Sequence, residues 1–120
     1  MLVEKLSNKI GDFKVVTTPT VPGYRITRVI GLANGLSPRT RGVGGVIVGA
    51  LQSIGGGEIS AFTSEIEKAR AEAITRAIQQ ARNNGANAIV SLDLETSNVG
   101  EGFITLISAT GTAVVIEKEN

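Results

Sequence analysis

Two carboxylates in the last third of the chain offer the clearest chemistry. Asp93 and Glu95 lie two residues apart in the segment NAIVSLDLE, where polar and apolar residues alternate. Alternate residues of a β-strand share one face of a sheet, so both carboxylates are expected on one face, roughly 7 Å apart at Cα. Carboxylate oxygens bind hard divalent cations. The pattern is compatible with a metal site at Asp93 and Glu95, and equally with a solvated strand face.

The chain contains no cysteine and no histidine, and Met1 is its single methionine. The missing histidine removes the usual general base at neutral pH and the commonest metal ligand. The missing cysteine removes disulfides and thiolate nucleophiles. Soft and borderline metals prefer the ligands that are absent. We therefore expect a protein that is not an enzyme and has no resident cofactor, with a divalent metal held by oxygen ligands as the remaining possibility.

Arg70 is the other polar candidate. It lies beside apolar residues that recur every three or four positions between about Ala61 and Asn84, as in an amphipathic helix. A functional interpretation gives Arg70 an anion contact or a salt bridge between subunits. In the plainer interpretation, its aliphatic stem covers apolar surface at the edge of the helix. We include Arg70 among the candidate interface residues.

Composition excludes several classes of partner. The net charge is +1, and Arg39 with Arg41 is the nearest approach to a basic cluster. We therefore expect no nucleic-acid partner. Aromatic residues make up only 3%, too few for base stacking. The most apolar stretch, Val43 to Ile54, is shorter than the roughly 20 residues that cross a bilayer. We expect a cytoplasmic chain without a signal peptide and without a membrane partner.

The periodicities predict the elements that must position these residues, in the order β-β-α-α-β-β. An N-terminal arm over residues 1–12 precedes a single α+β domain over 13–120, in which an antiparallel or mixed sheet is packed by one long helix. Strands are expected over 13–18, 24–36 with a possible extension to Thr40, 87–95 and 103–117. Helices are expected over 42–54 and about 61–84.

Glycines and caps refine these boundaries. Gly55 to Gly57 should end the first helix, Ser60 or Ser64 should cap the second, and Gly85 should terminate it. Other glycines should mark a bulge or bend in the second strand (Gly31 and Gly35) and a bulge in the last (Gly111). In the third strand, alternation places Ala88, Val90, Leu92 and Leu94 on one face and Ser91, Asp93 and Glu95 on the other.

The last strand is apolar on both faces, and such a strand needs cover on both. One long helix covers one face, so we expect another subunit to cover the second, because a large exposed apolar face marks an interface. The sequence therefore predicts a homo-oligomer. Its candidate interface residues are Arg70, Phe103, Ile107 and Val115.

The chain resembles the YbjQ-like family of heavy-metal-binding proteins over about residues 15–117. The blocks that carry the resemblance are VTTPTVPGYRI from Val16 to Ile26, Ile54-Gly55-Gly56, Ile66-x-x-Ala69-Arg70-x-x-Ala73, Gly85-Ala86-Asn87-Ala88-Ile89-Val90 and Gly111-Thr112-Ala113-Val114. The resemblance implies an α+β subunit similar to dodecin-like folds, which assembles into a ring as a homopentamer. It also implies a function in metal binding.

Two functions follow as hypotheses. The first is a non-enzymatic, homopentameric binding or scaffold protein that holds a small molecule or an ion between subunits. The second is a metal-ion-binding protein that uses the carboxylates of Asp93 and Glu95 as ligands.

Overall fold

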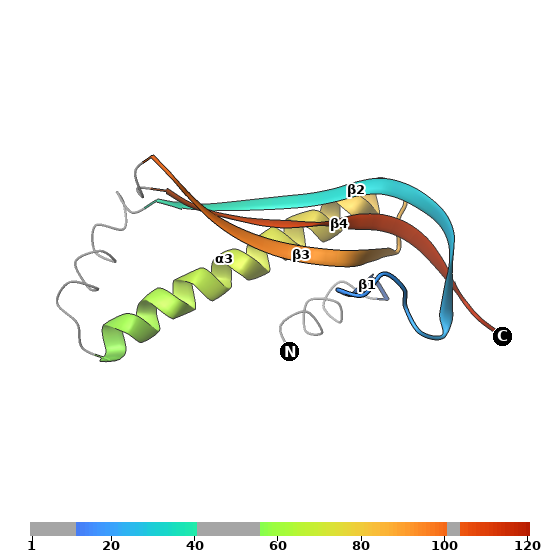
Figure 1. The fold of residues 1–120 in the computed structure, drawn as a ribbon, viewed down its shortest axis with the longest axis horizontal. Helices are drawn as coiled ribbons and strands as arrows, with labels where there is room; N and C mark the ends of the chain where they lie inside the picture. Colours follow the sequence, from blue (N-terminus) through green and yellow to red (C-terminus); the bar gives the residue numbers. More distant parts are fainter. Residues whose placement is uncertain (1–11, 41–55, 101–103) are drawn as a thin grey trace.

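The computed structural model describes residues 12–40, 56–100 and 104–120 (Figure 1). Within them the chain forms an α+β domain with one helix and a four-stranded mixed sheet, which confirms the predicted class and the order strand-strand-helix-strand-strand. The predicted helix over 42–54 and the predicted arm up to residue 11 lie outside the described residues, as does Phe103. The elements are β1 (Lys14–Val15), β2 (Tyr24–Thr40), α3 (Gly56–Asn83), β3 (Ala88–Val99) and β4 (Ile104–Lys118).

The sheet has the strand order β1-β3-β4-β2. β4 pairs antiparallel with both β3 and β2, whereas the short β1 pairs parallel with β3. The pairing of β2 with β4 runs from Tyr24 opposite Lys118 to Thr40 opposite Ile104. β2 is therefore an edge strand, and its outer edge pairs with no described strand.

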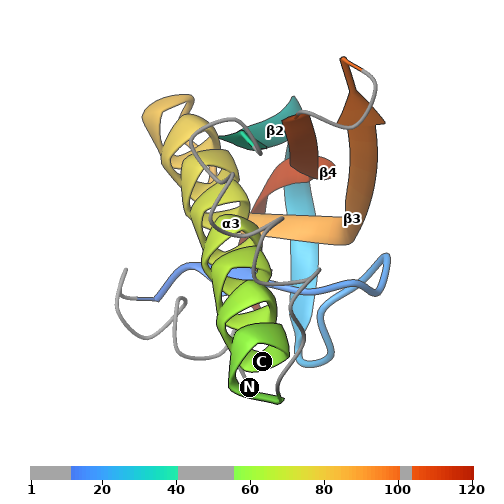
Figure 2. The same ribbon diagram turned by 90° about the vertical axis from the view of Figure 1, so that its left-hand side faces the viewer.

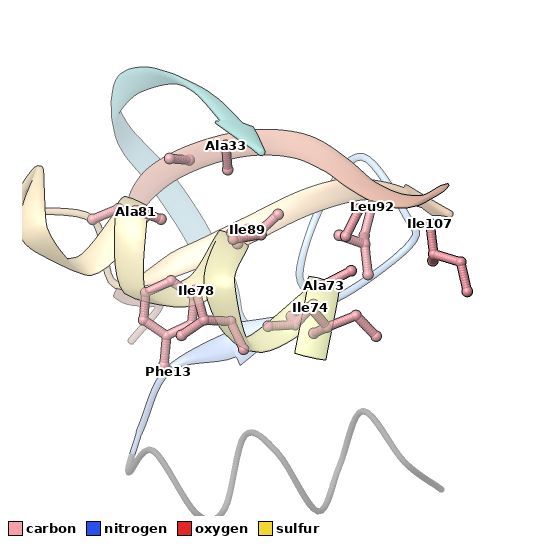
Figure 3. Close-up of a cluster of buried hydrophobic side chains, with 14 of the residues drawn as sticks. Phe13, Ala33, Ala73, Ile74, Ile78, Ala81, Ile89, Leu92 and Ile107 are labelled. Carbon is pink, nitrogen blue, oxygen red and sulfur yellow. The ribbon is translucent and has the colours of Figure 1, made fainter. Parts of the chain in front are cut away.

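The helix α3 lies across one face of this sheet (Figures 1 and 2). Its apolar residues repeat at helical spacing, so one side of the helix is buried against the strands (Figure 3). The opposite face, which we call the open face, carries no helix among the described residues. The core under α3 includes Ala73, Ile74, Ala77, Ile78 and Ala81 from the helix, and Ala33, Ile89, Leu92, Ile107 and Ala109 from the sheet.

Gly35 determines how closely α3 approaches β2. A Cβ atom on Gly35 would overlap the carbonyl oxygen of Ala73 and would lie 2.5 Å from the amide nitrogen of Ala77. The register around Gly35 is regular, with Ala109 as its partner on β4. Of the bulge or bend predicted at Gly35, the bulge is absent, and the glycine is needed because the helix backbone lies directly against it.

Two bulges in β2 lie between Ile26 and Arg28 and between Val29 and Gly31. Gly31 has a φ of +142°, which confirms the irregularity predicted there. Each bulge inserts one extra residue into the strand. Ile26, Val29 and Leu32 are three residues apart, yet all three lie on the open face because the bulges absorb the extra residues.

A further bulge in β3 consists of Ser91 and Leu92, which together face Gly111 of β4. Ser91 has a φ of +55°, and its amide donates a hydrogen bond of 2.9 Å to the carbonyl of Thr18. A Cβ on Gly111 would lie 2.6 Å from Cγ2 of Ile89. The bulge predicted in the last strand at Gly111 thus lies in its neighbour β3, and Gly111 leaves room for it.

This bulge changes the faces of β3. Val90 lies on the open face opposite Thr112, and Asp93, three residues later, lies on the same face opposite Thr110. Leu92 instead packs into the core under α3. The unbroken alternation predicted for this strand is therefore wrong, because one extra residue reverses the parity of every position after it.

The ends of α3 differ in how well the sequence predicts them. The helix begins at Gly56, so Ser60 and Ser64 lie within it and neither is the N-cap. A glycine costs a helix about 1 kcal/mol relative to alanine, which tertiary context can override. At the other end, Gly85 has a φ of +93°, and Ala86 donates a 3.0 Å hydrogen bond to Ala81. This Schellman arrangement confirms the predicted terminator.

We expect Gly35→Ala to lower the free energy of unfolding by about 3 kcal/mol, because the new methyl group overpacks a backbone contact. Gly23→Ala is the matched control. Gly23 has a φ of +83°, and a Cβ added to it would meet no atom within 4 Å, so its cost is backbone strain of about 1 kcal/mol. Urea denaturation of both variants measures the difference. Equal losses would contradict a steric role for Gly35.

Candidate functional site

A shallow hollow of about 410 Å³ lies on the open face between β2, β3 and β4. Both predicted carboxylates, Asp93 and Glu95, line it and are exposed. The β3 bulge places them there, on the same face as the even-numbered residues of β4. The full lining consists of Leu32, Ser91, Asp93, Glu95, Thr110, Gly111 and Thr112.

The donors around this hollow are all oxygen atoms. Asp93 and Glu95 supply carboxylates, and Ser91, Thr110 and Thr112 supply hydroxyls. Nowhere in residues 12–40, 56–100 and 104–120 do three or more Asp, Glu, Cys or His side chains gather around one point. Hard cations accept such oxygen ligands, but soft metals need sulfur or imidazole. The residues at the hollow therefore do not fit a heavy-metal ion.

A second polar cluster joins β2 to α3 on the helix-covered face. The hydroxyl of Ser37 donates a 2.9 Å hydrogen bond to Oε1 of Glu72. Arg39 reaches two glutamates, with Nε 3.1 Å from Oε1 of Glu65 and Nη1 3.4 Å from Oε1 of Glu72. Nη2 of Arg76 lies 2.9 Å from the same Glu72 oxygen, so these two residues, four apart on α3, form an ion pair along the helix.

The electrostatics of this cluster favour an ionised Glu72. Hydrogen bonds from Ser37 and Arg39 lower the pKa of Glu72 below its ordinary value of 4.5. Partial burial opposes this shift, and the positive charges of Arg39 and Arg76 add to it. Ser37 itself is fully buried, and its hydroxyl has both a donor and an acceptor among its neighbours. The cluster therefore fastens the C-terminal part of β2 to the helix.

The three predicted interface residues that the structure describes, Arg70, Ile107 and Val115, lie apart from the open face. Ile107 is fully buried in the core under α3, so its side chain is unavailable to a partner. Val115 is half-buried on the same side of the sheet, one residue before the open-face Ile116. Arg70 is exposed on α3, where it makes no hydrogen bond or ion pair to another described residue. The face of β4 that carries Ile107 is therefore covered by α3 of the same chain. It offers a partner less apolar surface than the sequence suggests.

Among the described residues, four of the six exposed large apolar side chains lie on β2, which the sequence did not single out, and the other two, Leu94 and Val99, lie on β3. The exposed fractions on β2 are 38% for Ile26, 64% for Val29, 70% for Leu32 and 46% for Leu36. The register with Ile116, Val114, Thr112 and Ser108 places all four on the open face. We call these four residues the apolar row. Because their spacing is irregular, a search for strict alternation in the sequence does not show that they share a face.

Part of the open face is covered by the chain before β2. Val21 is buried there with Val90, Val114 and Ile116, and Tyr24 packs against this group. The amide of Leu92 donates a 3.0 Å hydrogen bond to the carbonyl of Val16, which helps to hold this segment along β3. The segment reaches Ser91 at the hollow through the hydrogen bond to Thr18, whereas Leu32 stays exposed. Among the described residues, no helix is both long and apolar enough to cross a membrane.

These features define a class of small α+β protein in which one helix covers one face of a long, bulged sheet. The chain belongs to the YbjQ family, described as "Putative heavy-metal-binding", whose model matches residues 13–117. A UPF0145 protein of Pyrococcus furiosus is 44% identical over 93% of this chain and 97% of its own length. One of Methanocella arvoryzae is 43% identical over 92% of this chain and 91% of its own. Neither these names nor the family description states a catalytic activity.

A solved structure shows the same fold. It is the crystal structure of a protein of unknown function of the DUF74 family from Pediococcus pentosaceus. The match has a TM-score of 0.60 and covers 89% of this chain and 100% of that one. Because the two sequences are 15% identical, the likeness extends to the fold alone.

The Glu72 cluster gives a prediction about acid stability. A carboxylate with a lowered pKa in the folded state adds stability above its unfolded pKa and loses it as the pH falls through the folded pKa. We expect Glu72→Gln to lower the free energy of unfolding at pH 7, because the ionic contacts with Arg39 and Arg76 are lost. The loss should be only about 0.5–1 kcal/mol, because the side chain is partly exposed. This difference should shrink below pH 4.5.

Urea denaturation from pH 3 to pH 7 measures the effect. Lys68→Gln is the control, since it also changes the net charge by one at an exposed position of α3. A loss in Glu72→Gln that is the same at every pH would contradict an ionic role for this carboxylate.

Proposed function

We propose that this protein is a non-enzymatic, homo-oligomeric binding or scaffold protein whose subunits meet through the open face and the β2 edge. The observation that carries the proposal is the apolar row of Ile26, Val29, Leu32 and Leu36 on an edge strand. A row of large exposed apolar side chains on one face is typical of a contact surface.

The outer edge of β2, which pairs with no described strand, supports the same proposal. Unpaired strand edges attract other strands, and monomeric proteins protect them with charges, prolines or short length. β2 has 17 residues, and the stretch from Val29 to Ser37 contains neither a charge nor a proline. The arginines lie toward the ends of the strand, at Arg25, Arg28 and Arg39. A second copy of the chain would bury both the edge and the apolar row.

The dimensions of the subunit also favour assembly. Its radius of gyration is 16.7 Å, whereas a compact domain of this length has about 13.6 Å. The longest dimension of 57 Å matches the length of β2, about 55 Å for an extended strand. A sheet of this length has a large face relative to the volume of the subunit, and α3, the one helix of the described residues, covers only part of it.

The proposed assembly is a ring of five subunits, and this number rests on the resemblance to the YbjQ family. In such a ring each contact joins two unlike surfaces, and it closes when the rotation between neighbouring subunits divides a full turn evenly. The hollow beside Asp93 and Glu95 would then lie at or near a subunit interface, where a small molecule or an ion could be held.

The polar groups support a role other than catalysis. Among the described hydroxyls, that of Ser37 donates a hydrogen bond to a carboxylate, Glu72. Arg39 and Arg76 pair with the same carboxylate, and the lowered pKa of Glu72 makes it a weak base. A hydroxyl needs an effective base beside it to become a nucleophile. This pair is therefore better suited to joining α3 and β2.

Leu32→Glu tests the proposed assembly. Burial of a carboxylate in place of a leucine costs several kcal/mol, so we expect subunit association to weaken by about a hundredfold or more. Native mass spectrometry and light scattering after gel filtration measure the oligomer. Leu94→Glu is the matched control, because Leu94 is 37% exposed on the other face of the sheet, opposite Ala109. A monomeric wild type, or an unchanged oligomer in Leu32→Glu, would refute the proposal.

A second candidate function is the binding of a hard divalent cation by Asp93 and Glu95. The specific observation in its favour is that both carboxylates line one hollow together with three hydroxyls. One subunit supplies only two carboxylates there, and a ring would repeat them around its axis. Calcium and manganese accept such oxygen ligands.

Titration calorimetry with Ca²⁺ and Mn²⁺ tests this candidate. We expect binding at a fixed stoichiometry per chain, weakened at least tenfold in Asp93→Asn because a carboxylate ligand becomes a neutral amide. Glu117→Gln is the control. The Glu117 carboxylate does not line the hollow, and it already pairs with Arg25 at a distance of 3.2 Å. The absence of binding below millimolar cation would exclude this function.

A further inference from the structure

The family description names heavy metals, but the donor atoms of this chain do not match it. A cysteine, histidine or methionine normally supplies the sulfur or nitrogen that soft metals prefer. The 120 residues include no cysteine and no histidine, and Met1 provides the single thioether. Structural zinc sites usually have four ligands, most of them cysteine or histidine. All side-chain donors that remain for a metal, apart from Met1, are oxygen atoms or the nitrogens of cationic groups and amides.

Among the described residues, the two glutamates that lie against β2 are already paired with arginines. Glu65 and Glu72 on α3 both contact Arg39, and Glu72 also contacts Arg76. Guanidinium groups stay protonated at every working pH, so they repel an incoming cation. Displacing Arg39 would also leave the buried Ser37 without one of its hydrogen-bond partners. This cluster can therefore not serve as a metal site without loss of the contact between β2 and α3.

The carboxylates of Asp93 and Glu95 have no guanidinium partner among the described residues, but they are too few. They occupy alternate positions of one strand, about 7 Å apart at Cα, and no third Asp or Glu of the described residues joins them. Their neighbours around the hollow are the hydroxyls of Ser91, Thr110 and Thr112. Such a set of hard donors discriminates against soft ions.

We infer that this member of the family has no site for soft or borderline heavy-metal ions such as Cd²⁺, Cu⁺ and Zn²⁺. The inference concerns the chemistry of the donors and does not depend on the proposed assembly. A ring of identical subunits multiplies the oxygen donors and the single thioether of Met1, but it adds no thiolate or imidazole. The heavy-metal description thus applies to this chain through its fold and its relatives. The chain's own residues restrict any bound cation to the hard, oxygen-ligated class.

Equilibrium dialysis of the full chain against micromolar Cd²⁺, Cu⁺ or Zn²⁺, followed by elemental analysis, tests this inference. The protein must carry no histidine tag, because a tag supplies the imidazoles that the sequence lacks. We expect no retention of metal at a fixed ratio to the chain. Retention of one ion per chain, or of one ion per ring, at micromolar free metal would overturn the inference.

A gain-of-site variant shows that the assay can detect binding on this surface. Asp93 and Thr110 face each other across β3 and β4, and opposed side chains on neighbouring strands have Cβ atoms about 5 Å apart. Asp93→His combined with Thr110→His should therefore retain Zn²⁺ where the wild type does not. Binding of Ca²⁺ or Mn²⁺ alone would agree with the inference and support the second candidate function. Zn²⁺ binding by the wild type that Asp93→Asn abolishes would overturn it.

Discussion

The contact between the backbones of α3 and β2 at Gly35 is the constraint on which the rest of the structure depends. With no side chain at Gly35, the helix lies directly against the strand, and alanines such as Ala73 and Ala77 keep the separation small. A close contact explains how a chain with 3% aromatic residues fills its core with short aliphatic side chains. It also brings Ser37 and Arg39, which follow Gly35 on the same face, within reach of the α3 glutamates.

The bulges in β2 and β3 decide which chemistry each face of the sheet presents. A strand without bulges would send Ile26, Val29 and Leu32 to alternating faces, because successive side chains point in opposite directions. The bulges instead collect them on the open face. The bulge at Ser91 directs Asp93 to that face as well and turns Leu92 toward α3. Apolar and acidic side chains therefore meet on the surface that α3 leaves uncovered.

Membership of the family and the capacity to bind heavy metals are separate properties of this chain. The family model and the relatives place this chain in the YbjQ family, and the solved structure shares its α+β fold. The heavy-metal part of the description requires donor atoms, and donors depend on individual residues and not on the fold. In this chain the open face offers an apolar row and oxygen ligands, which suits contact between subunits better than capture of a soft metal.

Periodicity in the sequence was sufficient to predict α3, the three long strands and the termination at Gly85, because helix and strand spacing follow from local geometry. The same reasoning predicted that Asp93 and Glu95 share a face, since one intervening residue separates them. It failed at Leu92 and at the apolar row of β2, because a bulge reverses parity without a consistent local signal.

Only the tertiary structure placed Arg39 beside Glu65 and Glu72, and Ile107 beneath α3. These contacts join residues far apart in the chain, and they depend on which face the helix covers. By itself, the sequence determined the repertoire of elements and the donor chemistry of the chain, since both follow from residue types and their spacing. The tertiary structure decided which residues meet and which stay exposed, since those outcomes depend on register, bulges and the close approach of the helix.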